Sequence, residues 1–228
     1  VNAASLTGNI SGAATTTIAG LTNGTIAGTG TLSSGSLTSS SVTGGTNTIT
    51  GAATVTLVNG GTTNVGGIAT VTTLTTGTLN LNGATSSIGT LNGGSVALGA
   101  STALTVNDGT FAGVISGSTG SLTKASAGVL ILTGTNTYAG GTALEAGILR
   151  VGNNSALGVG SLTITGGYLR TAGTTARTLA NDIILSATAY FGEYYTDYGA
   201  LTLTGNVDLG AAAPRTIDLQ ADVTLSGV

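Results

Sequence analysis

Hydrophobic and polar residues alternate along most of the chain in short segments that end in glycine. Ser5–Gly8, Thr25–Gly28 and Thr48–Gly51 are examples. Alternation with a period of two is typical of β-strands with one buried face, and no segment keeps the 3.6-residue period of an amphipathic helix. The pattern predicts an all-β chain in which glycines mark the turns between short strands.

Internal repeats distinguish a β-helix from a β-sandwich. Gly147–Arg150 returns as Gly167–Arg170 after 20 residues (167 − 147), and Leu162–Gly166 returns as Leu201–Gly205 after 39 residues (201 − 162), about two such units. A coil of about 20 residues lets three short strands wrap once around a core. We therefore expect a β-helix (β-solenoid) of roughly eleven coils, about 55 Å long at about 4.8 Å per coil.

The alternation also predicts which side chains form the core between residues 129 and 170. One set should point inward and stack from coil to coil, and the other should point outward. The predicted inward set is Leu130, Leu132, Leu144, Leu149, Val151, Leu162, Ile164 and Leu169, and the outward set is Val129, Ile131, Glu145, Arg150, Thr163 and Arg170.

The most distinctive motif spans residues 121–151. It contains Leu122-Thr123-Lys124, the strand Gly128–Gly134, Asn136-Thr137-Tyr138 and Gly140-Gly141-Thr142. This sequence resembles the passenger-associated strand repeat of autotransporters, and residues 155–228 match the same repeat more loosely. The resemblance implies a right-handed parallel β-helix displayed outside a bacterial cell.

Glycine and asparagine in this motif have expected structural roles. Gly134, Gly140, Gly141 and Gly147 fall where the chain must turn, and glycine permits the positive φ of such corners. Asn136 is expected to bond neighbouring backbone at a corner.

Charge divides the chain into two parts. The thirteen charged residues all follow Asn107, and the net charge is −3. We predict Gly/Thr/Ser-rich coils over residues 1–118, uncharged up to Asn107, that continue into strand-repeat coils over 119–228. Asp108–Val114 has an echo in Asp222–Val228, 114 residues later (222 − 108), which predicts a further copy beyond Val228.

Composition narrows the possible functions. The chain has no Cys, Met, Trp or His and only five Lys and Arg residues. These numbers argue against nucleic-acid binding, and no cofactor or metal is expected. No apolar run is long enough for a membrane-spanning helix, so no membrane insertion of this segment is expected.

The acidic residues are mostly isolated, and no base, nucleophile or calcium-binding repeat accompanies them. We therefore expect no catalytic residues. Aromatic side chains with carboxylates can stack on and hydrogen-bond a sugar, although the same segment could be a turn whose tyrosines cover the coil edge. The possible glycan contacts are Tyr190, Glu193, Tyr194, Tyr195, Asp197 and Tyr198.

Two arginines form a second candidate. With a 20-residue coil, Arg150 and Arg170 would lie one above the other, a like-charge contact. They could clamp an acidic glycan, or Glu145 or solvent could screen them.

The favoured function is that of an extracellular structural or adhesive β-solenoid at the bacterial cell surface: a stalk, an adhesin shaft or a self-assembling filament. The expected partners are further copies stacked end to end and host or matrix glycans. One alternative is a carbohydrate-binding or carbohydrate-degrading β-helix that uses Tyr190–Tyr198. A lesser one is a threonine array that binds ice, built from pairs such as Thr54-Val55-Thr56 and Thr70-Val71-Thr72.

Overall fold

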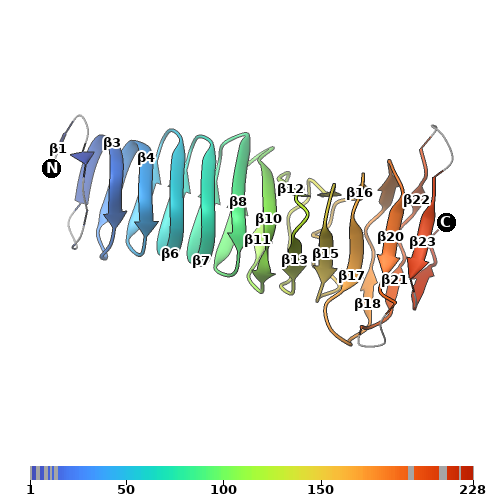
Figure 1. Cartoon of the computed structure of the whole chain (residues 1–228). Helices are drawn as coiled ribbons and strands as arrows, with labels where there is room; N and C mark the ends of the chain where they lie inside the picture. Colours follow the sequence, from blue (N-terminus) through green and yellow to red (C-terminus); the bar gives the residue numbers. More distant parts are fainter. Residues whose placement is uncertain are drawn as a thin grey trace.

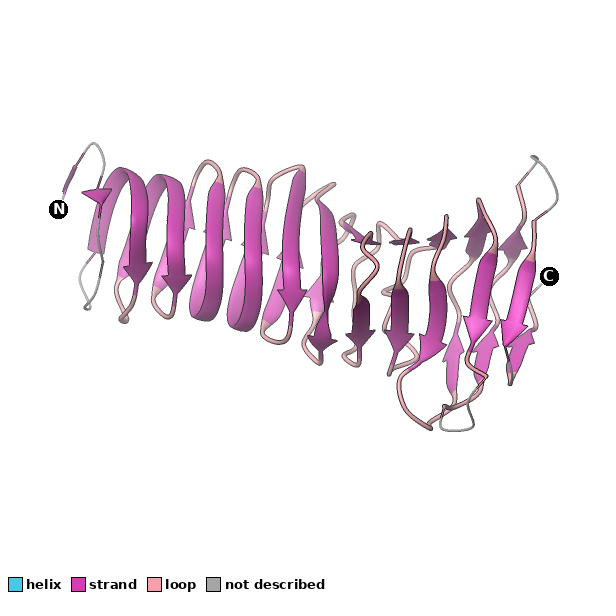
Figure 2. Ribbon diagram, viewed as in Figure 1, coloured by secondary structure: helices cyan, strands magenta, loops and turns pink. Residues whose placement is uncertain are grey.

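The chain forms an elongated stack of β-strands in a computed structural model. The structure describes residues 2–3, 6–7, 10, 12, 15–194, 198–210, 215–220 and 222–227. Every regular element among them is a strand, and β1 and β23 lie at opposite ends of the molecule (Figures 1 and 2). The strands are β1 (Asn2–Ala3), β2 (Leu6–Thr7), β3 (Thr15–Ile26), β4 (Thr31–Val42), β5 (Thr46–Ile49), β6 (Ala53–Val65), β7 (Ala69–Leu81), β8 (Thr85–Leu91), β9 (Ser95–Leu98), β10 (Ala103–Phe111), β11 (Ile115–Ser116), β12 (Ser121–Lys124), β13 (Val129–Leu132), β14 (Thr142–Leu144), β15 (Ile148–Val151), β16 (Leu162–Ile164), β17 (Tyr168–Thr171), β18 (Arg177–Leu179), β19 (Ile183–Leu185), β20 (Ala189–Gly192), β21 (Leu201–Leu203), β22 (Val207–Asp208), β23 (Ile217–Gln220) and β24 (Val223–Leu225).

All strand pairings in the described part are parallel, and each strand pairs with its counterpart in the next coil. One row of paired positions runs through about 11 coils of about 18 residues, which confirms the predicted β-solenoid. The row is Leu6, Leu21, Leu37, Ala53, Ala69, Ser86, Leu104, Leu122, Thr142, Leu162, Ile183 and Val207.

Each coil contributes to three faces. Face 1 carries β5, β9, β11, β18, β21 and β24, face 2 carries β12, β14, β16, β19 and β22, and face 3 carries β13, β15, β17, β20 and β23. The N–H of Thr137 donates to the Ile115 carbonyl and that of Val159 to the Tyr138 carbonyl, so hydrogen bonds continue face 1 beyond β11. The Thr178 N–H of β18 then donates to Asn154 Oδ1 at 3.1 Å. The long early strands, such as β4 and β6, bend around corners and serve more than one face.

The coils lengthen along the chain. The row on face 2 advances by 16 residues from Leu37 to Ala53, by 18 from Leu104 to Leu122 and by 24 from Ile183 to Val207. The coil length of about 20 inferred from the repeats therefore holds for the middle of the chain, where Arg150 pairs with Arg170 as predicted.

Two of the sequence repeats do not occupy equivalent positions in the stacked coils. Leu162 belongs to face 2 and pairs with Ile183, whereas Leu201 belongs to face 1 and pairs with Arg177. Asp108 likewise lies in β10, while its counterpart Asp222 directly precedes β24 on face 1. Interpreting the 39-residue echo as two coils is thus wrong, because strands on any face share the same apolar-polar alternation.

The predicted inward and outward sets between residues 129 and 170 are confirmed. All eight inward residues are at most 1% exposed, and they join one continuous core. Val129, by contrast, is 37% exposed, and the other outward residues are at least partly accessible. The core is therefore a column of aliphatic layers, one for each coil.

The glycines of the motif differ in why they are needed. Gly141 and Gly147 have φ values of 88° and 73°, as expected for corners. Gly134 and Gly140 do not adopt positive φ; a Cβ on Gly134 would lie 1.9 Å from the Gly113 carbonyl oxygen, and one on Gly140 would lie 2.4 Å from the Thr119 oxygen. At these two positions the close approach of the previous coil, not the turn conformation, requires glycine.

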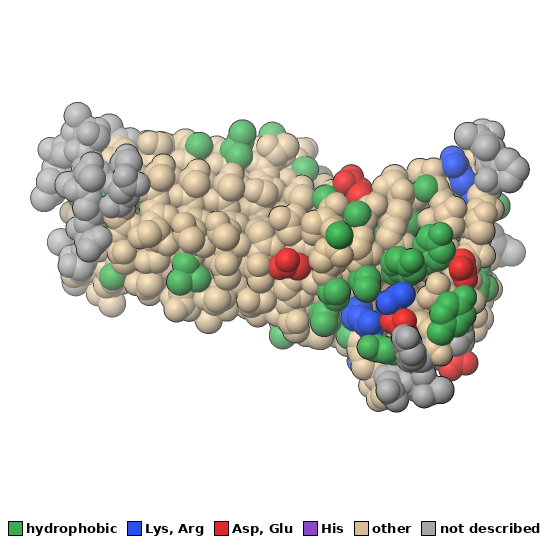
Figure 3. Space-filling model, in the orientation of Figure 1, with side chains coloured by type: hydrophobic (Ala, Val, Ile, Leu, Met, Phe, Trp, Pro, Cys, Tyr) green, Lys and Arg blue, Asp and Glu red, His purple; other side chains and the backbone are tan. Residues whose placement is uncertain are grey.

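Charge is unevenly distributed over the surface. The part of the molecule before Asp108 shows neither acidic nor basic side chains, and the charged groups gather toward the other end (Figure 3). The exposed Thr54 and Thr70 lie side by side in neighbouring coils, but Ser87 takes the next position in that row. Thr38 precedes Thr54 in this row, but Ser40 stands two residues after it, so the aligned Thr-x-Thr pairs of the row are those of Thr54 and Thr70.

Candidate functional site

Charged and aromatic side chains gather on the outer surface of face 3. Strands β15, β17 and β20 lie side by side there, and apolar, acidic and basic groups mix in this region of the surface (Figure 3). We call this group the arginine-tyrosine cluster; it consists of Arg150, Tyr168, Arg170, Tyr190, Glu193 and Tyr198.

Glu193 is the centre of the cluster. Its Oε2 lies 3.1 Å from Arg150 Nη2 and 2.7 Å from Arg170 Nη1. The Glu193 side chain is only 8% exposed, and each arginine side chain is 13% exposed. One carboxylate therefore bridges two guanidinium groups that the coil repeat places directly above each other, and it offsets one of their two positive charges.

Aromatic rings enclose the same arginines. The Arg150 guanidinium carbon lies 4.2 Å from the centre of the Tyr198 ring, and that of Arg170 lies 4.5 Å from the centre of the Tyr168 ring. Tyr168 also packs against Tyr190 of the next coil, with ring centres 4.8 Å apart. These contacts hold the cations against aromatic faces, where they are attracted by the ring quadrupole.

Backbone contacts tie the segment after β20 to earlier coils. The Thr171 hydroxyl donates to the Gly199 carbonyl at 2.9 Å, and the Gly199 N–H donates to the Gly173 carbonyl at 2.9 Å. Arg150 Nη1 donates to the Thr171 carbonyl at 3.3 Å. Glu193, Tyr198 and Gly199 thus fold back over the coils of β15 and β17.

The candidate glycan contacts fall into three groups. Tyr190, Glu193 and Tyr198 lie in the cluster, Tyr194 beside it is 67% exposed, and Tyr195 and Asp197 lie outside the described residues. The expectation that Glu145 or solvent screens the arginines is wrong, because Glu193 does so. The arginine clamp is consequently filled by the chain's own carboxylate.

Two polar residues of the motif are buried, which was not predicted from the sequence. Lys124 has no exposed surface, and its ammonium group donates to the backbone carbonyl of Ser126, to the Ser126 hydroxyl at 3.3 Å and to the Ala146 carbonyl at 3.3 Å. Burial lowers the pKa of Lys124, and nearby Asp108 opposes that change. The alternation Leu122-Thr123-Lys124 contained the signal, because it places Lys124 on the inward side.

Tyr138 is also fully buried, and its hydroxyl lies 2.6 Å from the Thr142 hydroxyl. The Thr142 hydroxyl donates in turn to the Leu157 carbonyl at 3.2 Å. Burial raises the pKa of Tyr138 well above its ordinary value, and the hydrogen bond to Thr142 only partly offsets this. Lys124 and Tyr138 therefore form hydrogen bonds with buried polar groups at two corners of the solenoid, and their polar ends do not face a ligand site.

Asn136 connects three consecutive coils, which confirms its predicted bonds to neighbouring backbone. Its Oδ1 accepts the Ile115 N–H at 2.7 Å, and its Nδ2 donates to the Ala156 carbonyl at 2.6 Å. The side chain is 1% exposed. It replaces ladder bonds at a corner where the strands are interrupted.

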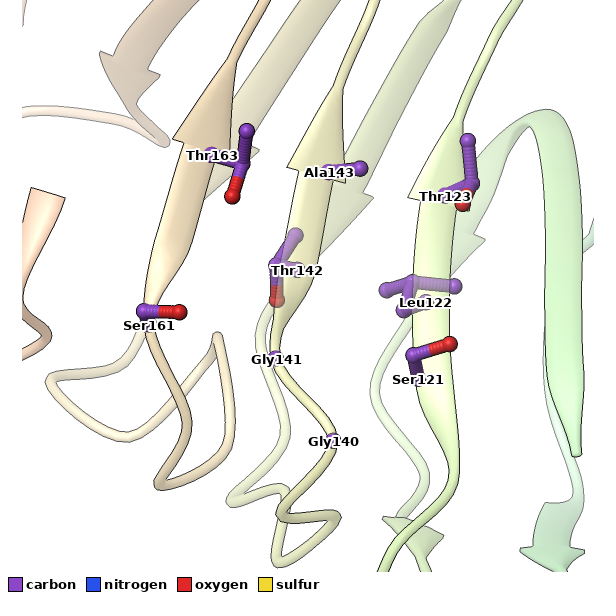
Figure 4. A pocket seen from close by; sticks show the side chains of 9 residues that line it. All are labelled: Ser121, Leu122, Thr123, Gly140, Gly141, Thr142, Ala143, Ser161 and Thr163. Atoms are coloured by element: carbon purple, nitrogen blue, oxygen red, sulfur yellow. The ribbon is translucent and has the colours of Figure 1, made fainter. Parts of the chain in front are cut away.

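A shallow cavity of about 220 Å³ opens on face 2, over β12, β14 and β16. The upper edge of the molecule steps down here from β10 to β16 (Figure 1). Its outward side chains carry hydroxyl groups along both borders and small residues in the middle (Figure 4). We call it the hydroxyl groove; its outward lining comprises Ser121, Thr123, Gly140, Gly141, Ala143, Ser161 and Thr163.

The acidic side chains of the described residues are too far apart to form a metal site. Among the described residues, no three Asp or Glu side chains lie close enough together to hold a metal ion. The described part also contains no helix that could cross a membrane.

Comparisons with known proteins agree with the fold. Residues 122–151 match the family model of the passenger-associated-transport repeat. The chain is 34% identical over 123 residues to an adhesin, BmaC autotransporter, of Brucella suis biovar 1 (strain 1330), a match that covers 54% of this chain and 3% of that protein. The chain thus spans a small fraction of that relative, and no solved structure matches it. Residues 122–151 therefore match a passenger-associated-transport repeat, and over 123 residues the chain is similar to an autotransporter adhesin.

Proposed function

We propose that this chain is an extracellular structural and adhesive segment of a surface-displayed protein and that it has no catalytic role. The observation that carries the proposal is the unbroken parallel ladder of about 11 coils, in a chain that shares a passenger repeat with autotransporters. Parallel stacking with an aliphatic layer in each coil gives a stiff rod, and a rod suits the display of surfaces at a distance from a membrane. The similarity to an autotransporter adhesin supports the adhesive part.

Antibodies raised against the 228-residue chain test this function on intact cells of the natural host. We expect them to label unpermeabilised cells and to reduce attachment of those cells to a surface. Labelling that appears only after lysis would contradict display outside the cell. Release of reducing sugar from a polysaccharide by the purified chain would contradict the non-catalytic role.

We also propose that the coil formed by β22, β23 and β24 pairs with another coil of the same kind. Leu219 is 46% exposed, although its partner position in the previous coil, Phe191, is 1% exposed. Val223 and Leu225 also pack only partly against the core. Unpaired strand edges with apolar neighbours are templates for further β-pairing.

Sedimentation over a concentration series, with electron microscopy of the same samples, tests this pairing. We expect elongated particles longer than one chain as the concentration rises. A single species of monomer mass at every concentration would contradict the proposal.

A further inference from the structure

We infer that the hydroxyl groove on face 2 binds one neutral pyranose ring of an extracellular polysaccharide. This inference goes beyond the proposed structural role and does not depend on it. It rests on the shape, hydrogen-bonding capacity and charge of the groove, which nothing in the passenger-repeat match assigns.

The strand register arranges four hydroxyl groups as the corners of a rectangle. Thr123, Ala143 and Thr163 are aligned across β12, β14 and β16. Ser121, at the start of β12, and Ser161, directly before β16, occupy the preceding outward positions at the two borders (Figure 4). The rectangle measures about 9.6 Å across two strand spacings and about 6.7 Å along two residues.

The floor of this rectangle is formed by residues with small side chains. Gly141 has a φ of 88°, and a Cβ there would lie 2.8 Å from the Ser161 carbonyl oxygen, so no larger residue fits without strain. Ala143 contributes only a methyl group. A sugar ring can therefore lie flat, with its C–H face on the floor and its hydroxyl groups toward the borders.

The four border hydroxyls are free to bond a ligand. None of Ser121, Thr123, Ser161 and Thr163 has a side-chain hydrogen bond to any described residue, whereas the inward Thr142 hydroxyl is engaged by Tyr138 and Leu157. Outward hydroxyls elsewhere often bond to the preceding coil, as Thr75 does with Asn59 at 2.9 Å. A hydroxyl both donates and accepts, which matches the hydroxyls of a sugar.

Charge favours a neutral sugar over an acidic one. The lining of the groove contains no charged residue, and the exposed Glu145 follows Ala143 by two residues at one end. A uronic acid carboxylate would meet this carboxylate without a compensating cation. The open shape and the lack of aromatic rings point to a dissociation constant in the millimolar range.

Amide chemical shifts of the 228-residue chain, followed during titration with neutral disaccharides and with glucuronic acid, test the inference. We expect saturable shifts at Ala143 and Thr163 with at least one of maltose, cellobiose, lactose or mannobiose, and none with glucuronic acid. Ala143→Leu fills the floor and should weaken binding at least about 10-fold. The same change at the outward Ala97 is the matched control and should leave binding unchanged.

A second variant guards against a folding defect in the first. Thr123→Val with Thr163→Val keeps the side-chain shape but removes two hydroxyls, and should weaken binding about 5- to 50-fold. The inference is overturned if no neutral sugar gives saturable shifts in the groove, if glucuronic acid binds as well as they do, or if both variants bind like the unaltered chain.

Discussion

At the scale of the residue, the direction of each side chain decides its effect on stability. Leu132 is fully buried between Phe111 and Val151 of the neighbouring coils. Ile131, one position earlier, faces outward and lies beside Arg150 of the next coil. Neighbouring positions in one strand thus differ as much as core and surface.

Leu132→Asp should therefore destabilise the chain by more than about 4 kcal/mol, because it places an unpaired carboxylate among aliphatic side chains. Ile131→Asp should cost less than about 1 kcal/mol, since its carboxylate remains in solvent beside a guanidinium group. Urea unfolding of the two variants measures both values. If Ile131→Asp proved the more damaging substitution, the assigned register would be wrong.

Tyr138 gives a prediction at alkaline pH. Burial raises its pKa in the folded chain above the ordinary value of 10.0, so above that pH the unfolded chain loses this proton while the folded chain keeps it. The free energy of unfolding should fall as pH rises above about 10, by up to about 1.4 kcal/mol per pH unit for this one group.

Tyr138→Phe removes this group and should flatten the fall in the unfolding free energy above pH 10. Lys124 acts in the opposite direction at lower pH, because its pKa is lowered in the folded chain. As pH rises from that lowered pKa to the ordinary pKa of 10.5, its contribution to the unfolding free energy should increase. Urea unfolding between pH 8 and 11 measures the slopes. Equal slopes for Tyr138→Phe and the unaltered chain would show that this hydroxyl does not control the alkaline limit.

At the scale of the element, the arginine-tyrosine cluster holds β15, β17 and the segment after β20 together. Glu193→Gln would leave Arg150 and Arg170 as neighbouring cations with little exposed surface. We expect a loss of about 2–3 kcal/mol in unfolding free energy, smaller in high salt. Glu145→Gln is the matched control and should change stability by less than about 0.5 kcal/mol.

Removing one cation as well should restore part of this loss. In Glu193→Gln with Arg150→Gln, the like-charge contact is gone, so the double variant should be less destabilised than the sum of the single variants. Additive losses, or a Glu193→Gln variant as stable as the unaltered chain at low salt, would show that the ion pairs do not hold these coils together.

The elements also show how far sequence reasoning could go. Alternation predicted the strands, the inward leucines around Leu132 and the stacking of Arg150 on Arg170, because these depend on spacing within one or two coils. It did not predict the shorter early coils or the partner of the arginines. Both depend on how turns of different length fold, and Glu193 is 43 residues from Arg150.

At the scale of the whole molecule, the parallel register between successive coils accounts for the length of the rod. Each coil adds one strand spacing to every face, so distance along the rod depends on the number of coils and not on the number of residues. The outward row Thr38, Thr54, Thr70, Ser87, Thr105 and Thr123 spans five such steps on face 2.

Spin labels on this row test the parallel solenoid most directly, and the chain has no native cysteine to interfere. Pulsed electron-electron distance measurements on Thr38→Cys with Thr105→Cys should give a mean near 19 Å, and Thr38→Cys with Thr123→Cys a mean near 24 Å, one strand spacing of about 4.8 Å longer. Narrow distributions that differ by this one step are predicted. Distances that do not increase from the first pair to the second, or broad distributions without a maximum, would contradict the stacked-coil fold.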